Sequence, residues 1–282
     1  MAIAELKEAF TLLRQLPVLW LPGIVGGLLA AALWVTLNLY GTFFAGRLMV
    51  ISGLVLFIFT TGMLTITRNE DGGILALLKG GIRYYFRVLL PLIIIASGII
   101  LIFMLLSVTF SLFGITDMGI VTALAFGFMT PTIILTFFFD TAAVFEDRRI
   151  FDSIRRSIRL VFAHVNEVIA FLFIYVVIIA GIFFMSILVW SFILSIFLYD
   201  KLEPLSLNET QLQTFTPDQF IALIGPEGMW ITALVLFIGI FLLLPILYCY
   251  KACFFKKLAG RTVIIQQPTT GEYDSKGRWY KY

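Results

Sequence analysis

Long apolar stretches dominate this chain and restrict what it can fold into. A helix needs about 20 consecutive apolar residues to cross the hydrocarbon core of a bilayer. Because lipid cannot satisfy free backbone N–H and C=O groups, such stretches cross the membrane as helices. Six stretches are long enough, at residues 17–40, 45–67, 89–113, 119–140, 168–199 and 229–252. The sequence therefore predicts an all-α, polytopic membrane protein with six transmembrane helices.

The composition excludes the main classes of soluble protein. Hydrophobic residues make up 61% of the 282 residues and charged residues only 13%, and the mean hydropathy is +1.03. Soluble domains are about 45–50% apolar and about 25% charged. A soluble enzyme, a disordered protein and a nucleic-acid-binding module are therefore excluded, and we expect membrane lipids rather than nucleic acid as partners.

The basic residues are distributed unequally between the two sides of the predicted spans. Of the 20 Lys and Arg residues, only Arg47 and Lys201 fall on one side, and the other 18 fall on the opposite side. Basic residues concentrate in cytoplasmic segments of membrane proteins. The distribution predicts a cell-membrane protein with both termini in the cytoplasm. The predicted outer loop, 200–228, is acidic and contains Asn208 in a glycosylation acceptor pattern.

Three segments that precede the odd-numbered spans have the pattern of basic amphipathic helices. They are residues 3–16, 72–89 and 148–165, and each has apolar residues spaced by three and four with basic residues on another face. Helices of this kind lie in the membrane interface with their cations toward anionic headgroups. Packing against the cytoplasmic ends of the spans explains the pattern equally well. The apolar stripes are Ile3, Leu6, Phe10 and Leu13; Leu75, Leu78, Ile82, Tyr85 and Leu89; and Ile150, Ile154, Ile158, Val161 and Val165.

An internal repeat connects these segments. Residues 6–10 match residues 78–82 and 154–158, at offsets of 72 and 148, in the order aliphatic, basic, two further residues and a large apolar residue. Each match precedes two spans, so the units are parallel repeats rather than inverted ones. We predict three parallel repeats of one in-plane amphipathic helix plus a two-span hairpin. The repeats cover roughly 3–68, 72–146 and 149–258 of a single transmembrane domain, 1–261, and a polar cytoplasmic tail follows at 262–282.

Charged residues near the spans supply two sets of candidate functional residues. The first set comprises basic residues that would contact lipid headgroups or a membrane-protein partner, which could be a second copy of the chain: Lys79, Arg83, Arg87, Arg155, Arg156 and Arg159. The second set is a structural polar cluster of Asp140, Glu146, Asp147 and Ser157. Asp140 ends the fourth stretch, and because charges inside a membrane are costly, we expect it to pair with a base such as Arg148 or Arg149, in a structural role rather than a transport role.

Residues for catalysis or metal binding are scarce. His164 is the only histidine, and Cys249 and Cys253 are the only cysteines. Two thiols cannot complete a tetrahedral metal site, so we expect both to be small buried hydrophobes. The sequence predicts neither an enzyme nor a cofactor. Gly23 and Gly27 form a small-xxx-small pair, which predicts close helix packing.

A more specific pattern follows the fourth stretch. A span runs into a turn of small and aliphatic residues that ends in Glu146 and Asp147, and an amphipathic helix with Arg156 and Ser157 at its centre comes next. The pattern resembles an uncharacterised prokaryotic polytopic membrane family that includes YciC-like inner-membrane proteins. It is also similar to the membrane domain of some glycerophosphoryl diester phosphodiesterases. The resemblance implies a multi-pass membrane fold. It does not imply phosphodiesterase activity, because this sequence has no matching catalytic domain.

These patterns favour a non-enzymatic integral membrane protein that organises lipids or a partner membrane complex through its basic interfacial helices. One alternative is a passive channel or transporter for an apolar or lipid-like solute, with a cavity behind a kink at Pro131. A membrane-embedded enzyme is a third hypothesis, which would need a polar pocket that gathers Glu146, His164 or Glu167.

Overall fold

The structure, a computed structural model, describes residues 2–70, 72–113, 118–202, 217–265, 271–273 and 279–281. Nearly all of these residues are helical, and five helices are long and apolar enough to cross a membrane. This confirms the helical, multi-pass character of the protein. In chain order the elements are α1 (Ala2–Gln15), the 3-10 helix η1 (Pro17–Trp20), α2 (Leu21–Asn69), α3 (Ile74–Leu112), α4 (Met118–Thr136), α5 (Phe139–Phe145), α6 (Ile150–Ala163), α7 (Val165–Leu202), α9 (Pro217–Ile265) and the antiparallel strands β1 (Gly271–Tyr273) and β2 (Trp279–Lys281).

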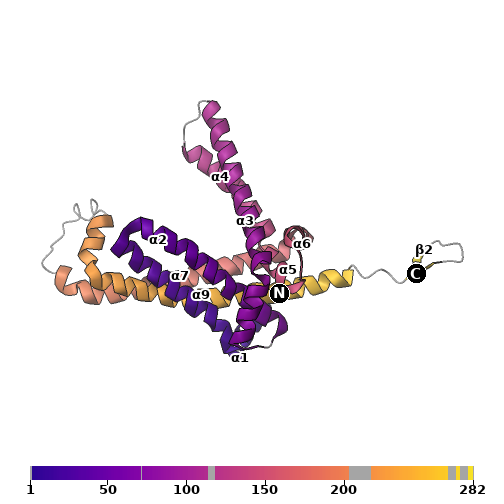
Figure 1. Cartoon of the computed structure of the whole chain (residues 1–282), viewed down its shortest axis with the longest axis horizontal. Coiled ribbons are helices and arrows are strands. Elements are labelled where there is room, and N and C mark those ends of the chain that lie inside the picture. Colours follow the sequence, from indigo (N-terminus) through magenta and orange to yellow (C-terminus); the bar gives the residue numbers. More distant parts are fainter. Residues whose placement is uncertain are drawn as a thin grey trace.

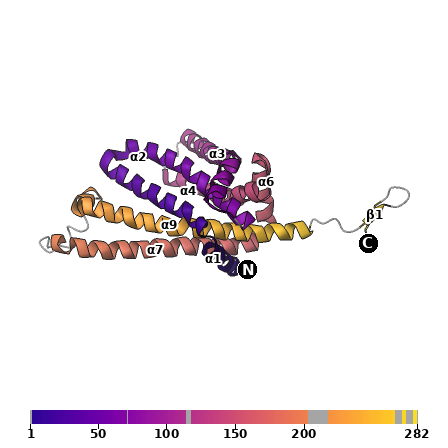
Figure 2. The same ribbon diagram turned by 60° about the horizontal axis from the view of Figure 1, so that its bottom comes forward.

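Helix α2 folds back on itself at Gly41. The φ angle of Gly41 is 78°, in the left-handed region that glycine adopts without steric cost. The two arms lie side by side (Figures 1 and 2), and a Cβ atom on Gly26 would lie 3.3 Å from Leu56 Cδ1 of the other arm. The predicted spans 17–40 and 45–67 are therefore the two antiparallel arms of one element.

Helices α1, α2, α7 and α9 pack together into what we call the body of the molecule, and α9 is its central element. It contacts α1, α2 and α5, and it runs beside α7 for much of its length (Figure 2). The first arm of α2 approaches α9 so closely that a Cβ atom on Gly27 would lie 2.6 Å from the carbonyl oxygen of Phe237. Gly23 is in similar contact with Phe241. The predicted role of Gly23 and Gly27 in close helix packing is confirmed.

An aromatic core fills the end of the molecule where α1, α5 and α6 lie, which we call the base. Phe171 of α7 stacks on Phe254 of α9 with ring centroids 4.3 Å apart, and Phe138 packs against both. Cys249 and Cys253 are buried in this core as free thiols. The expectation that they act as small buried hydrophobes is confirmed.

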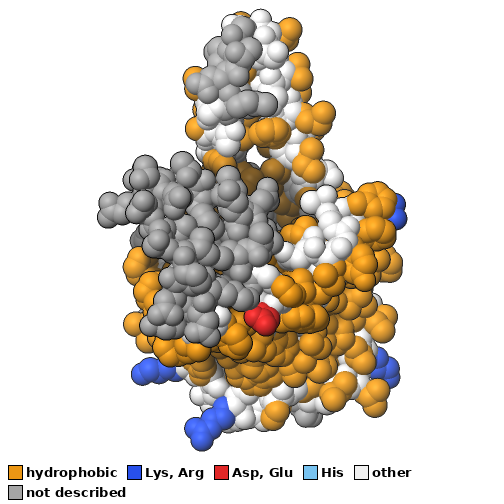
Figure 3. All heavy atoms as spheres, turned by 90° about the vertical axis from the view of Figure 1, so that its left-hand side faces the viewer, with side chains coloured by type: hydrophobic (Ala, Val, Ile, Leu, Met, Phe, Trp, Pro, Cys, Tyr) orange, Lys and Arg blue, Asp and Glu red, His pale blue; other side chains and the backbone are white. Residues whose placement is uncertain are grey.

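Helices α3 and α4 form an arm that diverges from the body (Figure 1). The first turns of α3 pack on α2, where Leu77 contacts Gly62, but the remainder runs outward beside α4. In Figure 3 the arm stands off from a body whose visible surface is largely hydrophobic. Exposed side chains such as Ile100, Leu101 and Phe126 need a lipid or protein neighbour.

The prediction of a separate in-plane helix at 72–89 was wrong. Residues from Ile74 onward belong to α3, which continues without interruption to Leu112. The boundary was misplaced because the charged and apolar parts of α3 have no turn between them, and Pro91 lies inside the helix without ending it. The other two amphipathic segments do correspond to separate helices, α1 and α6.

The faces that these three segments bury coincide with the predicted apolar stripes only in part, since Leu13 and Val161 are buried but most of the other stripe residues are not. Large stripe residues point outward: Ile3 is 64% exposed, Leu75 82% and Ile82 65%. Three sets of buried positions coincide under the offsets of 72 and 148, and several of their residues are small. They are Glu5, Leu77 and Ser153; Ala9, Gly81 and Ser157; and Leu12, Tyr84 and Leu160.

Candidate functional site

Two of the six candidate basic residues are engaged in ion pairs within the protein. Arg87 of α3 pairs with Asp147 in the loop after α5. Arg156 of α6 pairs with Glu146, with 2.8 Å between Nη2 and Oε1, and Glu146 also accepts from Arg148 Nε at 3.0 Å. These contacts join α3 and α6 to one loop, so we assign Arg87 and Arg156 a structural role.

The other four candidates, Lys79, Arg83, Arg155 and Arg159, are exposed. Within the described part of the chain they have no carboxylate partner. Large apolar side chains of the same two helices are also exposed. They are Leu75, Ile82 and Phe86 on α3, and Phe151 and Phe162 on α6. Exposed cations together with exposed large apolar residues are typical of a helix at a membrane interface.

A basic cavity of about 570 Å³ lies where α2 ends and α3 begins. Lys79 and Arg83 line it together with Arg68 of α2, and Asp147 is the one carboxylate among the described lining residues. Arg68 is held in place because it donates to the carbonyl oxygen of Val144 at 2.8 Å and to the Tyr84 hydroxyl at 3.3 Å. Three basic side chains thus face this cavity against one carboxylate among the described lining residues.

The four residues of the predicted polar cluster lie in separate interactions. Glu146 and Asp147 bind arginines at the base, as described above. Ser157 of α6 donates its hydroxyl to the carbonyl oxygen of Leu135 at 2.8 Å and accepts from the Phe138 N–H at 3.0 Å. Ser157 therefore holds the turn between α4 and α5 against α6. Asp140 faces a different element, α9.

Asp140 pairs with a basic residue, as expected, but the partner is neither Arg148 nor Arg149. Its carboxylate binds Lys251 of α9, with Nζ–Oδ1 and Nζ–Oδ2 distances of 2.7 and 2.8 Å. Asp140 begins the short helix α5, which directs its side chain toward α9, whereas Arg148 lies beyond the end of that helix. Both side chains are buried, with 7% of the Asp140 side chain and 10% of the Lys251 side chain exposed.

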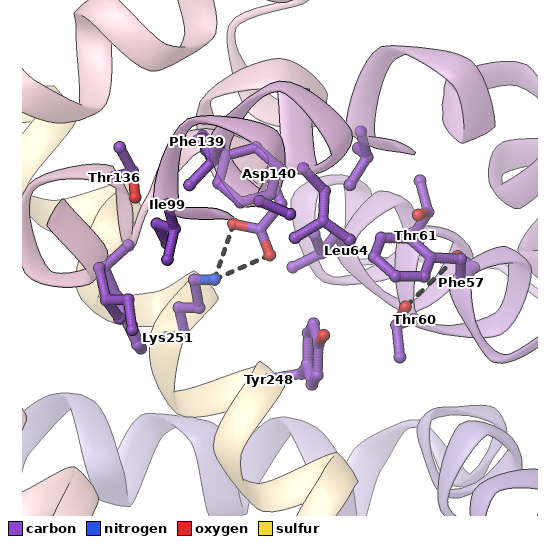
Figure 4. Close-up of a pocket in the computed structure, with 16 residues that line it drawn as sticks. Phe57, Thr60, Thr61, Leu64, Ile99, Thr136, Phe139, Asp140, Tyr248 and Lys251 are labelled. Atoms are coloured by element: carbon purple, nitrogen blue, oxygen red, sulfur yellow. Dashed lines mark hydrogen bonds and ion pairs between the residues drawn. The ribbon is translucent and has the colours of Figure 1, made fainter. Parts of the chain in front are cut away.

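The Asp140–Lys251 pair lies in the wall of a cleft between the arm and the body (Figure 4). The cleft has a volume of about 290 Å³, and most of its lining is apolar. Its polar groups come from α2, with Thr60 and Thr61, from α4, with Thr136, from Tyr248 of α9, and from the ion pair itself. A mostly apolar cavity with a few convergent polar groups is the usual form of a small-molecule site.

Lys251 is the functional candidate that the sequence analysis missed. It was counted only among the basic residues on the inner side, although it lies within the apolar stretch 229–252. Charges inside a membrane protein almost always pair with one another. One lysine within an apolar stretch and one aspartate at the end of another therefore indicate that the two residues pair.

Two of the three residues named for the enzyme hypothesis lie together. His164 Nδ1 lies 3.0 Å from Glu167 Oε2, whereas Glu146 binds Arg148 and Arg156. The described residues contain no group of three His, Cys, Asp or Glu side chains that could hold a metal ion.

Comparisons with known proteins leave the family of the chain open. No family model, no curated protein and no solved structure matches it. The resemblance of residues 139–161 to the YciC-like family therefore stays a prediction.

Proposed function

We propose that this protein is a non-enzymatic, six-span protein of the cell membrane that binds anionic lipid headgroups at its cytoplasmic base and thereby organises lipids around it. The observation behind the proposal is the set of exposed cations without carboxylate partners, Lys79, Arg83, Arg155 and Arg159, beside exposed large apolar side chains. We name these four residues the basic surface.

The six-span topology is supported by the fold of α2. Its two arms, counted separately, make six spans together with α3, α4, α7 and α9. An even number of spans leaves both termini on one side, and the excess of Lys and Arg on that side assigns it to the cytoplasm. The base, with α1 and α6, is then the cytoplasmic end.

Three parallel repeats are supported by the common pattern of burial. Positions 5, 9 and 12 are buried, and so are their counterparts at offsets of 72 and 148. Each unit presents large apolar residues outward and packs a small residue inward. The outward residues, Phe10, Ile82 and Phe151 among them, would enter the acyl boundary of the cytoplasmic leaflet.

The expected affinity follows from electrostatics at the membrane surface. Each Lys or Arg near an anionic leaflet contributes about 1 kcal/mol, which corresponds to about a fivefold change in affinity. Removal of the four cations of the basic surface should therefore abolish most of the preference for anionic lipid.

The test uses the full-length protein in nanodiscs of phosphatidylcholine that contain a minor share of phosphatidylglycerol. Native mass spectrometry after extraction counts the anionic lipids retained per protein. We expect substitution of Lys79, Arg83, Arg155 and Arg159 by Gln to lower that number strongly, and we expect Arg47→Gln to leave it unchanged. Arg47 is also exposed, but by the proposed topology it lies on the outer side.

Equal retention of phosphatidylglycerol by the fourfold variant and the native protein would refute the proposal. If the fourfold variant instead lost a copurifying protein while it kept its lipids, the basic surface would be a docking site for a partner membrane complex. That result would also contradict the proposed lipid binding.

A further inference from the structure

Two cavities lie along one face of α3. The cleft beside the Asp140–Lys251 pair is lined on α3 by residues from Val88 to Ile99. A second cavity, of about 210 Å³, lies between α3 and α4 and is lined by residues from Ile99 to Phe103. The two share Ile99, and their lining residues on α3 recur at spacings of three and four. The two cavities therefore adjoin at Ile99, and we call them together the apolar path along the arm.

This path is longer than the hydrocarbon depth of one membrane leaflet. Val88 and Phe103 are 15 positions apart, which corresponds to about 22 Å along a helix. One leaflet contributes about half of a hydrocarbon core that is about 30 Å thick. A single acyl chain that enters from the cytoplasmic leaflet would extend from the cleft into the second cavity.

The end of the path near the base holds unused hydrogen-bonding capacity. The Thr61 hydroxyl is buried in the cleft wall and has no hydrogen-bond partner among the described residues. Buried polar groups are normally hydrogen-bonded. The ammonium group of Lys251 has three N–H donors. The two carboxylate oxygens of Asp140 lie within hydrogen-bond distance of it, so one donor remains for a ligand.

The charge at this end favours an uncharged polar group. Asp140 and Lys251 form a neutral pair, and the carboxylate would repel a free fatty acid or a phosphate. An ester carbonyl accepts hydrogen bonds without a net charge and joins directly to an acyl chain. The chemistry of the cleft thus matches the ester end of a glycerolipid.

We infer that the cleft binds one acyl chain of a glycerolipid, with its ester carbonyl at Thr61 and Lys251 and its methylene chain along the face of α3 toward α4. This site is distinct from the basic surface, and its occupation does not depend on an anionic headgroup.

Photo-cross-linking of the full-length protein in phosphatidylcholine nanodiscs tests the inference. The probe is a phosphatidylcholine with a diazirine in one acyl chain, and mass spectrometry maps the labelled peptides. We expect labelling to concentrate on residues 88–103 of α3 and 125–136 of α4. Labelling spread evenly over all lipid-exposed helices would overturn the inference.

A matched pair of variants on α3 distinguishes the cleft from the general lipid surface. Ala96 lines the cleft, and its neighbour Ser97 is exposed but does not line it. Ala96→Phe should abolish the concentrated labelling, whereas Ser97→Phe should preserve it. Native labelling of the Ala96→Phe variant would show that no chain occupies the cleft.

Two further measurements test the ester contact and the class of lipid. Thr61→Val keeps the shape of the side chain and removes the hydroxyl, and should lower labelling by about two- to tenfold, as expected for one hydrogen bond. Unchanged labelling would remove Thr61 from the site. Oleate in excess should not displace the probe, and displacement by oleate would identify a fatty-acid site and overturn the glycerolipid assignment.

The labelling experiment distinguishes the cleft site from headgroup binding at the basic surface. Replacement of the basic surface by Gln should leave the labelling of the cleft by phosphatidylcholine unchanged. If that labelling disappeared and returned only with a phosphatidylglycerol probe and an intact basic surface, the separate cleft site would be excluded and headgroup binding would stand.

Discussion

The Asp140–Lys251 pair is the side-chain interaction with the largest consequence for this protein. Two opposite charges buried in an apolar wall stabilise each other only while both are present, because either charge alone would lack a partner and water. Exposed pairs in the same molecule behave differently. Lys256 and Glu70, which also pair, are each almost half exposed.

We predict that Lys251→Met lowers the free energy of unfolding by about 3–5 kcal/mol, since it leaves the Asp140 carboxylate buried without a partner. The double variant with Asp140→Leu and Lys251→Met should recover most of this loss because it removes both charges. Denaturant titration of the detergent-solubilised protein measures the free energy of unfolding of both variants. Lys256→Met serves as the control and should cost less than about 1 kcal/mol. A double variant as unstable as Lys251→Met would contradict the explanation.

Ser157 is the second side chain whose loss should be costly. Its hydroxyl donates to the carbonyl oxygen of Leu135 and accepts from the N–H of Phe138. Phe138 is fully buried. Ser157→Ala leaves both backbone groups without these partners, and we expect a loss of about 1–3 kcal/mol. Ser195→Ala should have little effect in the same unfolding assay, because Ser195 is exposed and bonds only within its own helix.

Close approach between helices decides how α2 and α3 pack. Gly81 faces the carbonyl oxygen of Ile58, and Gly80 faces Thr65, so the first turns of α3 lie directly on the second arm of α2. Farther along α3, Gly98 has no atom within 4 Å of where a Cβ would lie. The same residue type thus has opposite roles in the packed and the diverging parts of one helix.

A pair of alanine substitutions should reveal this difference. Gly81→Ala places a methyl group against backbone that cannot move aside cheaply, so we expect loss of stability and separation of α3 from α2. Gly98→Ala should be neutral or stabilising by up to about 1 kcal/mol, because alanine is the better helix former. Thermal unfolding compares the two. Equal effects would mean that α3 does not pack on α2 through Gly81.

The molecule as a whole consists of a body built around α9 and an arm of α3 and α4 that diverges from it (Figure 1). The body is held at the base by aromatic packing and by basic residues of α9, since Lys251, Lys256 and Lys257 pair with acids of α5, α2 and α1. The described part of the arm touches the rest of the molecule mainly through the first turns of α3 and the last turns of α4.

Cysteine labelling in intact cells tests the topology of the whole chain. Tyr40 lies at the turn of α2 and is 65% exposed, whereas Lys79 is exposed at the base. We predict that a membrane-impermeant maleimide labels the Tyr40→Cys variant from outside and labels the Lys79→Cys variant only after lysis. The native thiols are buried and give little background. Labelling of Lys79→Cys in intact cells would reverse the orientation.

The helical, multi-pass class of the protein follows from the apolar stretches alone, because lipid admits few other structures for them. The close packing of Gly23 and Gly27 and the burial of both cysteines also follow from local patterns. These are properties of single helices or of short spacings, and hydropathy and residue size are sufficient to predict them.

The pairing of Asp140 with Lys251, the continuity of α3 and the buried faces of the amphipathic segments depended on the tertiary structure. Lys251 lies 111 positions from Asp140, and no local pattern relates them. The apolar stripes indicated which residues avoid water, but in a membrane protein lipid satisfies that preference as well as the core does. Small residues fill several of the core-facing positions, because there the distance between helix backbones, and not hydrophobicity, decides what packs.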